Sequence, residues 1–485
     1  MQFMATKQHQ RIAIGTIFVL AFILYAYLKR ANLTLMAGDQ WVYFSASYLF
    51  AEGTIPYRDF FFSHAPLQIL LSTFLVKMGA NLVILNLLPA AIGGISGIIL
   101  FIMVKKSVGA LRALLACLLF LFSYGNLMST LYYTGQELGL LFSLLGTFFF
   151  LQRKKGWGGL CAGLSAAASI NMLVNCLVLT LTQWRWNRKY LPLFFGMMVG
   201  TFGAVQILFI TIAGWTYVEQ VYLYHLAKPD NSTWLASNAK VFWMMIHAHG
   251  LLIAFGLLGC LLSLRKWKNT EEVDGGEKKL VTLAMGMAGS QILFLMIIHP
   301  IFPHYFVSIV PFLAILAAEG VILGWEWTRA LMIPQRILII GTGIIMSILL
   351  VLSAKHTLRL YEIEQYLLGV PQVVEVAEVV RRGIPEDATI FGEFGIAPLV
   401  SLLSNRRLAA NIVDSSEMRI MGKQTTMEEM TDAIEADNVQ ILVNRERRGI
   451  NAYPPFWKYR DAHFFLSRTI QAEGFPTAIE IWRRK

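Results

Sequence analysis

The stretch from Met36 to Pro66, MAGDQWVYFSASYLFAEGTIPYRDFFFSHAP, separates two strongly apolar segments. It is too polar to cross a bilayer, yet it is more aromatic than an ordinary solvated loop. Its charged and titratable side chains stand among tryptophan, tyrosine and phenylalanine: Asp39, Glu52, Arg58, Asp59 and His64. This mixed character suits the boundary between a membrane and water, where aromatic rings gather.

The composition of the whole chain is that of a membrane protein. Of its 485 residues, 56% are hydrophobic and only 15% are charged, whereas soluble domains carry about 25% charged residues. A helix needs about 20 apolar residues to cross a bilayer, with a lower limit near 17. The segments of roughly this length are Ile12–Leu28, Leu82–Val104, Ala110–Tyr124, Gln136–Gln152, Tyr190–Ala213, Val241–Leu264, Leu280–Ile298, Tyr305–Leu323 and Arg336–Ala354. We therefore predict a polytopic α-helical membrane protein with about nine full spans.

The net charge of +11 indicates membrane orientation and not nucleic-acid binding. The basic residues cluster at the ends of apolar segments: Lys105-Lys106, Arg153–Lys155, Arg185–Lys189 and Arg265–Lys268. Basic residues are enriched in cytoplasmic loops. The four cysteines all lie inside apolar segments: Cys117, Cys161, Cys176 and Cys260. We expect free buried thiols, with no disulfide framework and no zinc site.

The apolar segment from Trp157 to Thr182 has basic clusters at both of its ends. A single span would place one cluster on the outer face and would invert every later segment. We therefore predict a broken hairpin that enters and returns on one side, with Asn171 and Asn175 near its turn. The irregular backbone at such a turn must be covered by protein.

With the N-terminus inside, the polar and aromatic loops gather on the outer face of the cytoplasmic (inner) membrane. These loops are 29–66, 125–135, 214–240 and 299–304. The multi-span domain is expected at 1–355, and 356–485 is expected to be a small extracytoplasmic α/β domain. Its helical patterns are Gln372–Arg382 and Met427–Ala436, and its strand-like runs are Ala388–Phe391, Val439–Val443 and Ile479–Trp482. Because the polar and aromatic loops gather on the outer face, we expect the active site there.

Within the opening stretch we predict two short helices at the membrane surface. An apolar face begins at Trp41, and Gly53 ends the first helix. The second begins near Ser63 and has Pro66 in its first turn. Asp39 stands just before the first helix, where aspartate is a favoured N-cap.

The order Gly-Asp, then a tyrosine-rich helix, then EGTIPYRDF and HAPL, resembles the first outer loop of the GT-C class of polyprenyl-phosphate-sugar-dependent glycosyltransferases. These are multi-spanning enzymes of the broad group that includes protein O-mannosyltransferases and aminoarabinose lipid A transferases. The resemblance covers roughly residues 1–355. It implies transfer of a sugar from a polyprenyl phosphate to an acceptor lipid, glycan or protein on the outer face.

The resemblance implies roles for two acidic residues. The family's acid in the first outer loop corresponds to Asp39, which would activate the acceptor or help to hold a divalent cation, Mg or Mn. A second acid corresponds to Glu137 in YYTGQELGLLF, and the two would share the cation. Many relatives have Asp-Glu at the first position, whereas this chain has Asp39-Gln40, which weakens the prediction of a metal site. Glu137 is also open to a structural role at a helix N-terminus.

The leaving phosphate needs positive charge beside it. The outward-facing candidates are Arg58, His64, His225, Lys228, His299 and His304. Relatives often have Lys-Pro-Pro where this chain has His64-Ala65-Pro66, and histidine is only partly charged at neutral pH. Each candidate has a simpler alternative: a histidine at a span end is commonly an interface anchor, and Arg58 with Asp59 forms an exposed ion pair of small value.

Two other classes of function stay open at this point. A non-enzymatic transporter or lipid flippase would have polar or interrupted helices near the midplane, and here the polar residues concentrate in outer loops. An accessory subunit with the fold but without activity is the other alternative, and Gln40 keeps it open. The sequence names neither the sugar nor the acceptor.

Overall fold

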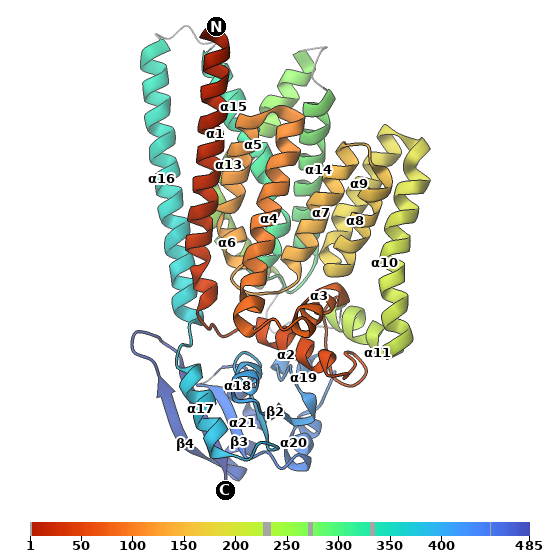
Figure 1. The fold of residues 1–485 in the computed structure, drawn as a ribbon, viewed down its shortest axis with the longest axis vertical. Helices are drawn as coiled ribbons and strands as arrows, with labels where there is room; N and C mark the ends of the chain where they lie inside the picture. Colours follow the sequence, from red (N-terminus) through yellow and green to blue (C-terminus); the bar gives the residue numbers. More distant parts are fainter. Residues whose placement is uncertain (1, 227–233, 270–274, 330–334, 447) are drawn as a thin grey trace.

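The structure is a computed structural model that describes residues 2–226, 234–269, 275–329, 335–446 and 448–485. A bundle of long helices holds the N-terminus at one end and a small α/β domain at the other (Figure 1). Each predicted span corresponds to a helix: α1 Gln2–Leu28, α4 Leu82–Val108, α5 Ala110–Leu121, α7 Gln136–Leu151, α10 Leu191–Ala213, α13 Trp234–Asn269, α14 Gly275–Ile297, α15 Val310–Arg329 and α16 Gln335–Leu368. The predicted polytopic architecture is confirmed.

Helix length separates these spans into two groups. Within the described residues, six helices are long and apolar enough to cross a membrane, and they belong to α1, α4, α10, α13, α14 and α15. Helix α5 has 12 residues and α7 has 16, so each is shorter than a full span. Helix α5 ends at Leu121 because the chain turns there into the short helix α6, Tyr124–Ser129.

The predicted broken hairpin is present. Helix α8 (Lys155–Ala168) and helix α9 (Leu173–Trp186) have 14 residues each and are separated by the 3₁₀ turn η2, Ile170–Met172. At 1.5 Å per residue each helix is about 21 Å long, less than the ~30 Å of a bilayer core. The side-chain amide of Gln291 donates to the Asn171 carbonyl and to Asn175 Oδ1, both at 3.1 Å. Protein therefore satisfies the backbone at the turn, as the break requires.

Two short helices follow the first span, as predicted. Helix α2 (Gln40–Ala51) and helix α3 (Pro66–Lys77) lie across the end of the bundle, between it and the α/β domain (Figure 1). Gly53, just past the end of α2, has φ +101°, a conformation that glycine adopts without strain. The first two turns of α2 are buried on every side, with Trp41 and Phe44 completely inaccessible. Its aromatic face therefore packs inside the protein and does not face the bilayer.

The C-terminal domain contains a five-stranded mixed sheet in the order β2-β1-β3-β5-β4. The predicted strands correspond to β1 (Thr389–Gly392), β3 (Ile441–Arg445) and β5 (Ala478–Arg484), and the predicted helices to α17 (Val373–Gly383) and α20 (Met427–Ala436). The sequence pattern did not reveal β2 (Arg407–Leu408), which is too short, or β4 (Phe464–Gln471), an edge strand with mostly exposed side chains. The other helices here are α18 (Ala397–Ser404), α19 (Glu417–Met421) and α21 (Pro454–His463).

Backbone hydrogen bonds join the first outer loop to the far end of the chain. Ala37 N donates to the Leu368 carbonyl at 2.7 Å, and Val370 N donates to the Leu35 carbonyl at 3.0 Å. Gly38 N donates to the Gly395 carbonyl at 3.3 Å. The expected domain division at residue 355 falls inside α16, which continues as one helix to Leu368. The loop that precedes Asp39 is therefore held by α16 and by the α/β domain together.

A buried pair of asparagines holds the start of this loop against the bundle. Asn32 Nδ2 lies 2.9 Å from the Asn86 carbonyl, 3.0 Å from that of Thr130 and 3.1 Å from that of Leu131. Asn86 Nδ2 donates in return to the Asn32 carbonyl at 2.6 Å. Both side chains are inaccessible to solvent. Asn32 thereby supplies a donor to the Thr130 and Leu131 carbonyls, which follow the end of α6.

The variant Asn32→Ala should lower the stability of the detergent-solubilised protein by at least ~2 kcal/mol, because it leaves several buried carbonyls without a donor. The thermal unfolding midpoint measures this loss. Asn187→Ala is the matched control, since the Asn187 side chain is exposed, and its midpoint should be unchanged. Equal midpoints for the two variants would contradict a structural role for Asn32.

Candidate active site

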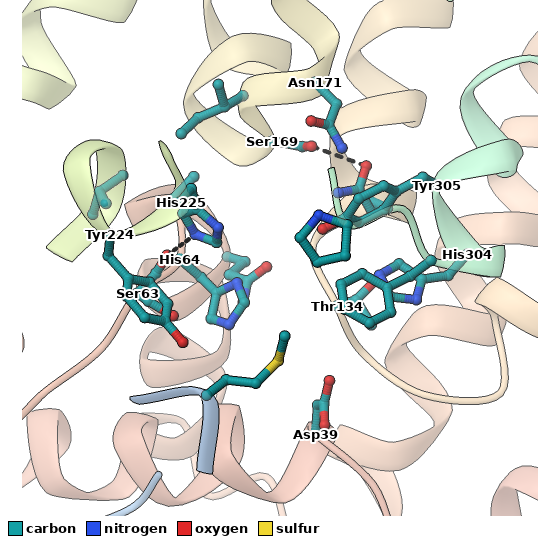
Figure 2. A pocket seen from close by; sticks show the side chains of 18 of the residues that line it. Asp39, Ser63, His64, Thr134, Ser169, Asn171, Tyr224, His225, His304 and Tyr305 are labelled. Atoms are coloured by element: carbon teal, nitrogen blue, oxygen red, sulfur yellow. Dashed lines mark hydrogen bonds between the residues drawn. The ribbon is translucent and has the colours of Figure 1, made fainter. Parts of the chain in front are cut away.

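A cavity of about 480 Å³ opens where the bundle meets the α/β domain. Its walls come from segments far apart in the sequence: the start of α2, residues 63–68, 134–136, 168–171, 221–226 and 294–305, and residues 394 and 414–418 of the C-terminal domain. In Figure 2, His64 and His225 lie on one side of the cavity and His304 and Tyr305 on the other. The volume is in the range of ordinary ligand pockets.

Asp39 stands at the N-cap position of α2, but its side chain makes no capping hydrogen bond to the helix. Its carboxylate points into the cavity (Figure 2). The neighbouring Gln40 is completely buried, and its Nε2 donates to the Met36 carbonyl at 2.9 Å. The side chain of Gln40 therefore has a structural role and does not line the cavity. Of the two residues in Asp39-Gln40, Asp39 is the one that lines it.

One wall pairs a histidine with a tyrosine. The Tyr43 hydroxyl lies 2.9 Å from His64 Nε2, and the two rings meet edge to face at 4.6 Å. Burial raises the pKa of the Tyr43 hydroxyl well above its usual value, and the charge of Asp39 raises it further. Tyr43 therefore stays protonated at neutral pH. It can orient the His64 imidazole through this hydrogen bond.

The same wall holds a second imidazole. His225 Nε2 lies 2.5 Å from the Ser63 carbonyl, and the His64 and His225 rings are 5.9 Å apart. The Gln220 amide fixes this arrangement, because its Nε2 donates to the Tyr57 carbonyl and its Oε1 accepts from Phe62 N, both at 2.9 Å. Gln220 lies in the π-helical turn η4 (Glu219–Leu223), between the helices α11 (Trp215–Val218) and α12 (Tyr224–Leu226). The first outer loop and the 214–226 segment are thus joined at the cavity wall.

The opposite wall contains the two late histidines. His304 lies in the 3₁₀ turn η5 (Pro303–Ser308), and its ring stacks on Phe302 with centroids 5.7 Å apart. His299 Nδ1 lies 3.0 Å from Asn238 Oδ1, and Asn238 Nδ2 donates to the Ile298 carbonyl at 2.8 Å. His299 and His304 both line the cavity. Imidazoles therefore face this space from both sides.

Two of the expected residues are not at the cavity. Arg58 is half exposed on the surface and forms an ion pair with Asp59 at 2.7 Å. This hydrogen bond holds the pKa of Asp59 below its usual value. Glu137 is buried behind the wall, where Thr134 Oγ1 donates to its carboxylate at 3.1 Å. Lys228 lies outside the described residues.

The structure places one of the two predicted metal ligands at the cavity. Asp39 lines the cavity and Glu137 does not. Among the residues that the structure describes, no group of three histidine, cysteine, aspartate or glutamate side chains is placed to hold a metal ion. The four cysteines are free thiols, as expected, and three of them are fully buried.

The sequence did not indicate the contribution of the C-terminal domain. Phe394, Asp414, Ser416 and Met418 all line the cavity. Asp414 stands in NIVDSSEM, which has no recognisable catalytic spacing. No local sequence motif marks this segment, because only the folding of the whole chain brings it next to the start of α2.

The variant Gln40→Glu tests whether the second position of the dipeptide is a lost metal ligand. It should lower the unfolding midpoint, because a buried carboxylate replaces an amide that donates to a carbonyl. It should not create binding of Mn²⁺ in a calorimetric titration. Gln10→Glu, at an exposed position, is the control for the added charge. Tight Mn²⁺ binding by Gln40→Glu alone would contradict the structural role of Gln40.

No protein-family model and no curated protein sequence matches the chain. Several solved structures match it. ArnT from Cupriavidus metallidurans in the apo state has a TM-score of 0.64 and 14% identity, covering 97% of this chain and 98% of that one. ArnT bound to undecaprenyl phosphate has a TM-score of 0.63 at 12% identity, covering 96% and 97%.

Two longer proteins are also similar. The Archaeoglobus fulgidus oligosaccharyltransferase has a TM-score of 0.61 and 12% identity over 93% of this chain and 73% of that one. The mycobacterial arabinofuranosyltransferase AftD has a TM-score of 0.55 and 12% identity, covering 98% of this chain and 40% of that one. These likenesses confirm the predicted GT-C fold of a multi-pass membrane protein, with a small C-terminal domain at one end of the bundle.

Proposed function

We propose that the protein is a membrane glycosyltransferase that moves a sugar from a polyprenyl phosphate to an acceptor hydroxyl or amine. The observation that carries this proposal is the meeting of the Asp39 carboxylate and several imidazoles around one cavity at the end of a membrane bundle. A lipid-linked donor needs its reactive group at the bilayer boundary while its tail stays among the spans. The cavity has that location.

The structural neighbours support the donor class. One ArnT structure holds undecaprenyl phosphate, and one structure of the archaeal oligosaccharyltransferase holds a dolichol-phosphate with an inhibitory peptide. A third structure of the archaeal protein contains zinc and sulfate. Both lipids are polyprenyl phosphates, so these neighbours support the class of donor lipid and not a particular sugar.

In the proposed reaction, the acceptor oxygen or nitrogen attacks the anomeric carbon of the sugar. The bond between that carbon and the phosphate oxygen breaks, and the polyprenyl phosphate leaves with the bonding electrons. The Asp39 carboxylate accepts the proton that the acceptor loses. The N-cap position of Asp39 favours the charged form, because the helix N-terminus stabilises a carboxylate.

The imidazoles serve the leaving phosphate in this proposal. A histidine ring N–H donates to phosphate oxygens, and a protonated ring adds positive charge. His64 and His225 lie together on one wall, and His304 lies on the other. Arg58 is excluded from this role because it lies on the surface, paired with Asp59. Tyr43 holds the His64 ring in place.

We further propose that the cavity and the C-terminal domain lie on the extracytoplasmic side of the cytoplasmic membrane. Lys105-Lys106 lie near the turn between α4 and α5, and Arg153–Lys155 lie near the turn between α7 and α8. Both turns are at the bundle end that holds the N-terminus (Figure 1). Basic residues mark the cytoplasmic side. The cavity and the α/β domain lie at the other end.

The variant Asp39→Asn should reduce sugar transfer by about 10²–10⁴-fold, the usual contribution of a general base. Transfer is measured in membranes that contain the protein, supplied with a panel of radiolabelled polyprenyl-phosphate sugars. Asp59→Asn is the matched control, because Asp59 lies at the surface end of the same loop, and it should transfer normally. A folded Asp39→Asn protein with full activity would remove Asp39 from the mechanism. A wild-type protein without transfer from any donor would favour an accessory subunit.

The variants His64→Ala and His225→Ala should each raise the KM for the donor about tenfold, since each loses one hydrogen bond to a charged phosphate worth ~1.5 kcal/mol. Initial rates at varied donor concentration measure this. Arg58→Ala is the control, because it removes a cation that lies outside the cavity. If Arg58→Ala weakened donor binding and the histidine variants did not, the assignment of the phosphate site would be wrong.

A further inference from the structure

The C-terminal domain completes the cavity that contains Asp39. Asp414 and Ser416 line it from the segment that leads into α19, Met418 lines it from the first turn of α19, and Phe394 lines it from the turn after β1. Asp414 Oδ1 accepts a hydrogen bond from Ser416 N at 2.9 Å, so the carboxylate has a defined orientation. A second acidic residue therefore lines the cavity that Asp39 lines, and it comes from a different domain.

This segment is fixed against the bundle side of the site. The Arg419 guanidinium stacks over the Phe61 ring at 4.7 Å, and its Nη1 donates to the Asp414 carbonyl at 3.1 Å. Gly422 packs so closely on Tyr224 that an added Cβ would lie 2.8 Å from the ring. Residues 414–422 are thereby held on the first outer loop and on the wall that carries His225. The position of Asp414 follows from the fold.

The charge of Asp414 acts inside the cavity. Burial is the main cause of the raised pKa of Tyr224, and the charge of Asp414 is the next cause. For the raised pKa of Tyr43, burial and then the charge of Asp39 are the main causes, and Asp414 makes the smallest contribution. The charge of Asp414 therefore acts chiefly near Tyr224.

The position of the α/β domain indicates that the cavity wall formed by this domain contacts the acceptor. The tail of a polyprenyl donor must remain in the bilayer, so the donor phosphate lies on the side of the spans. The α/β domain lies beyond the end of the bundle (Figure 1). A carboxylate only accepts hydrogen bonds, and it repels a nearby phosphate or carboxylate. On this wall the ring of Phe394 and the thioether of Met418 supply apolar surface for the C–H side of a sugar ring.

We propose that Asp414 is a specificity-determining residue that selects an acceptor presenting neutral sugar hydroxyls, and that it disfavours an acceptor with a phosphate beside its nucleophile. This proposal rests on the proposed glycosyltransferase function. Asp414 positions the acceptor through hydrogen bonds from its hydroxyls, and Asp39 takes the proton. The acceptor is thus a neutral glycan or glycolipid headgroup.

The test uses the full-length protein in lipid nanodiscs, a polyprenyl-phosphate sugar that the wild type cleaves, and two acceptor probes: octyl glucoside and octyl glucoside 6-phosphate. The wild type should prefer the neutral probe. Asp414→Asn should lower kcat/KM for the neutral probe about tenfold, the effect of one lost charge-assisted hydrogen bond. The ratio of kcat/KM for the neutral probe to kcat/KM for the phosphorylated probe should fall by a similar factor. Donor hydrolysis without acceptor should be unchanged.

Asp432→Asn is the matched control, because Asp432 is exposed on α20 in the same domain. It should keep the acceptor preference, and unfolding midpoints show that each variant is folded. An unchanged probe preference in folded Asp414→Asn overturns the proposal. A wild type that hydrolyses the donor but transfers the sugar to neither probe also overturns the proposal. A wild type that prefers the phosphorylated probe overturns it as well. A wild type that neither hydrolyses nor transfers any donor instead overturns the glycosyltransferase function itself.

Discussion

The constraint on which this structure depends is that backbone polar groups near bilayer depth must find partners inside the protein. The chain leaves regular helix around the cavity at residues 34–39, 130–135, 169–172 and 298–309. Side-chain amides compensate there: Gln40 serves the first segment, Asn32 the second, Gln291 the third and Asn238 the fourth. Each irregular segment thus receives a donor from a side chain of a neighbouring helix. The region that these segments form can therefore hold a polar cavity.

The first outer loop links this polar region to the C-terminal domain. Its backbone bonds to the end of α16 and to Gly395, and the next residue is Asp39. A buried, bidentate ion pair between Glu393 and Arg445 supports the same turn, and Glu393 also accepts from Gly395 N at 3.1 Å. The position of the proposed base therefore depends on contacts from the bundle and from the domain. Neither part builds the site alone.

Sequence reasoning found the loops of the site better than it found the orientation of single side chains. Asp39, His64, His225, His299 and His304 line the cavity, and all come from loops that were expected on one face. Arg58 stands only six residues before His64, yet its neighbour Asp59 holds it at the surface. Glu137 faces Thr134 inside the wall, because the direction of a residue at a helix start depends on what packs around it. Local sequence does not contain that packing.

The membrane architecture, the broken hairpin, the two short helices and most of the α/β elements could be predicted from the order of the amino acids. These follow from hydropathy, charge at span ends and local periodicity, which act over about 20 residues or fewer. The burial of Gln40, the position of Glu137 behind the wall and the contribution of Asp414 to the cavity became visible in the folded chain alone. Such placements depend on contacts between residues far apart in the chain. A one-dimensional pattern carries no information about which distant segment will lie opposite Asp39.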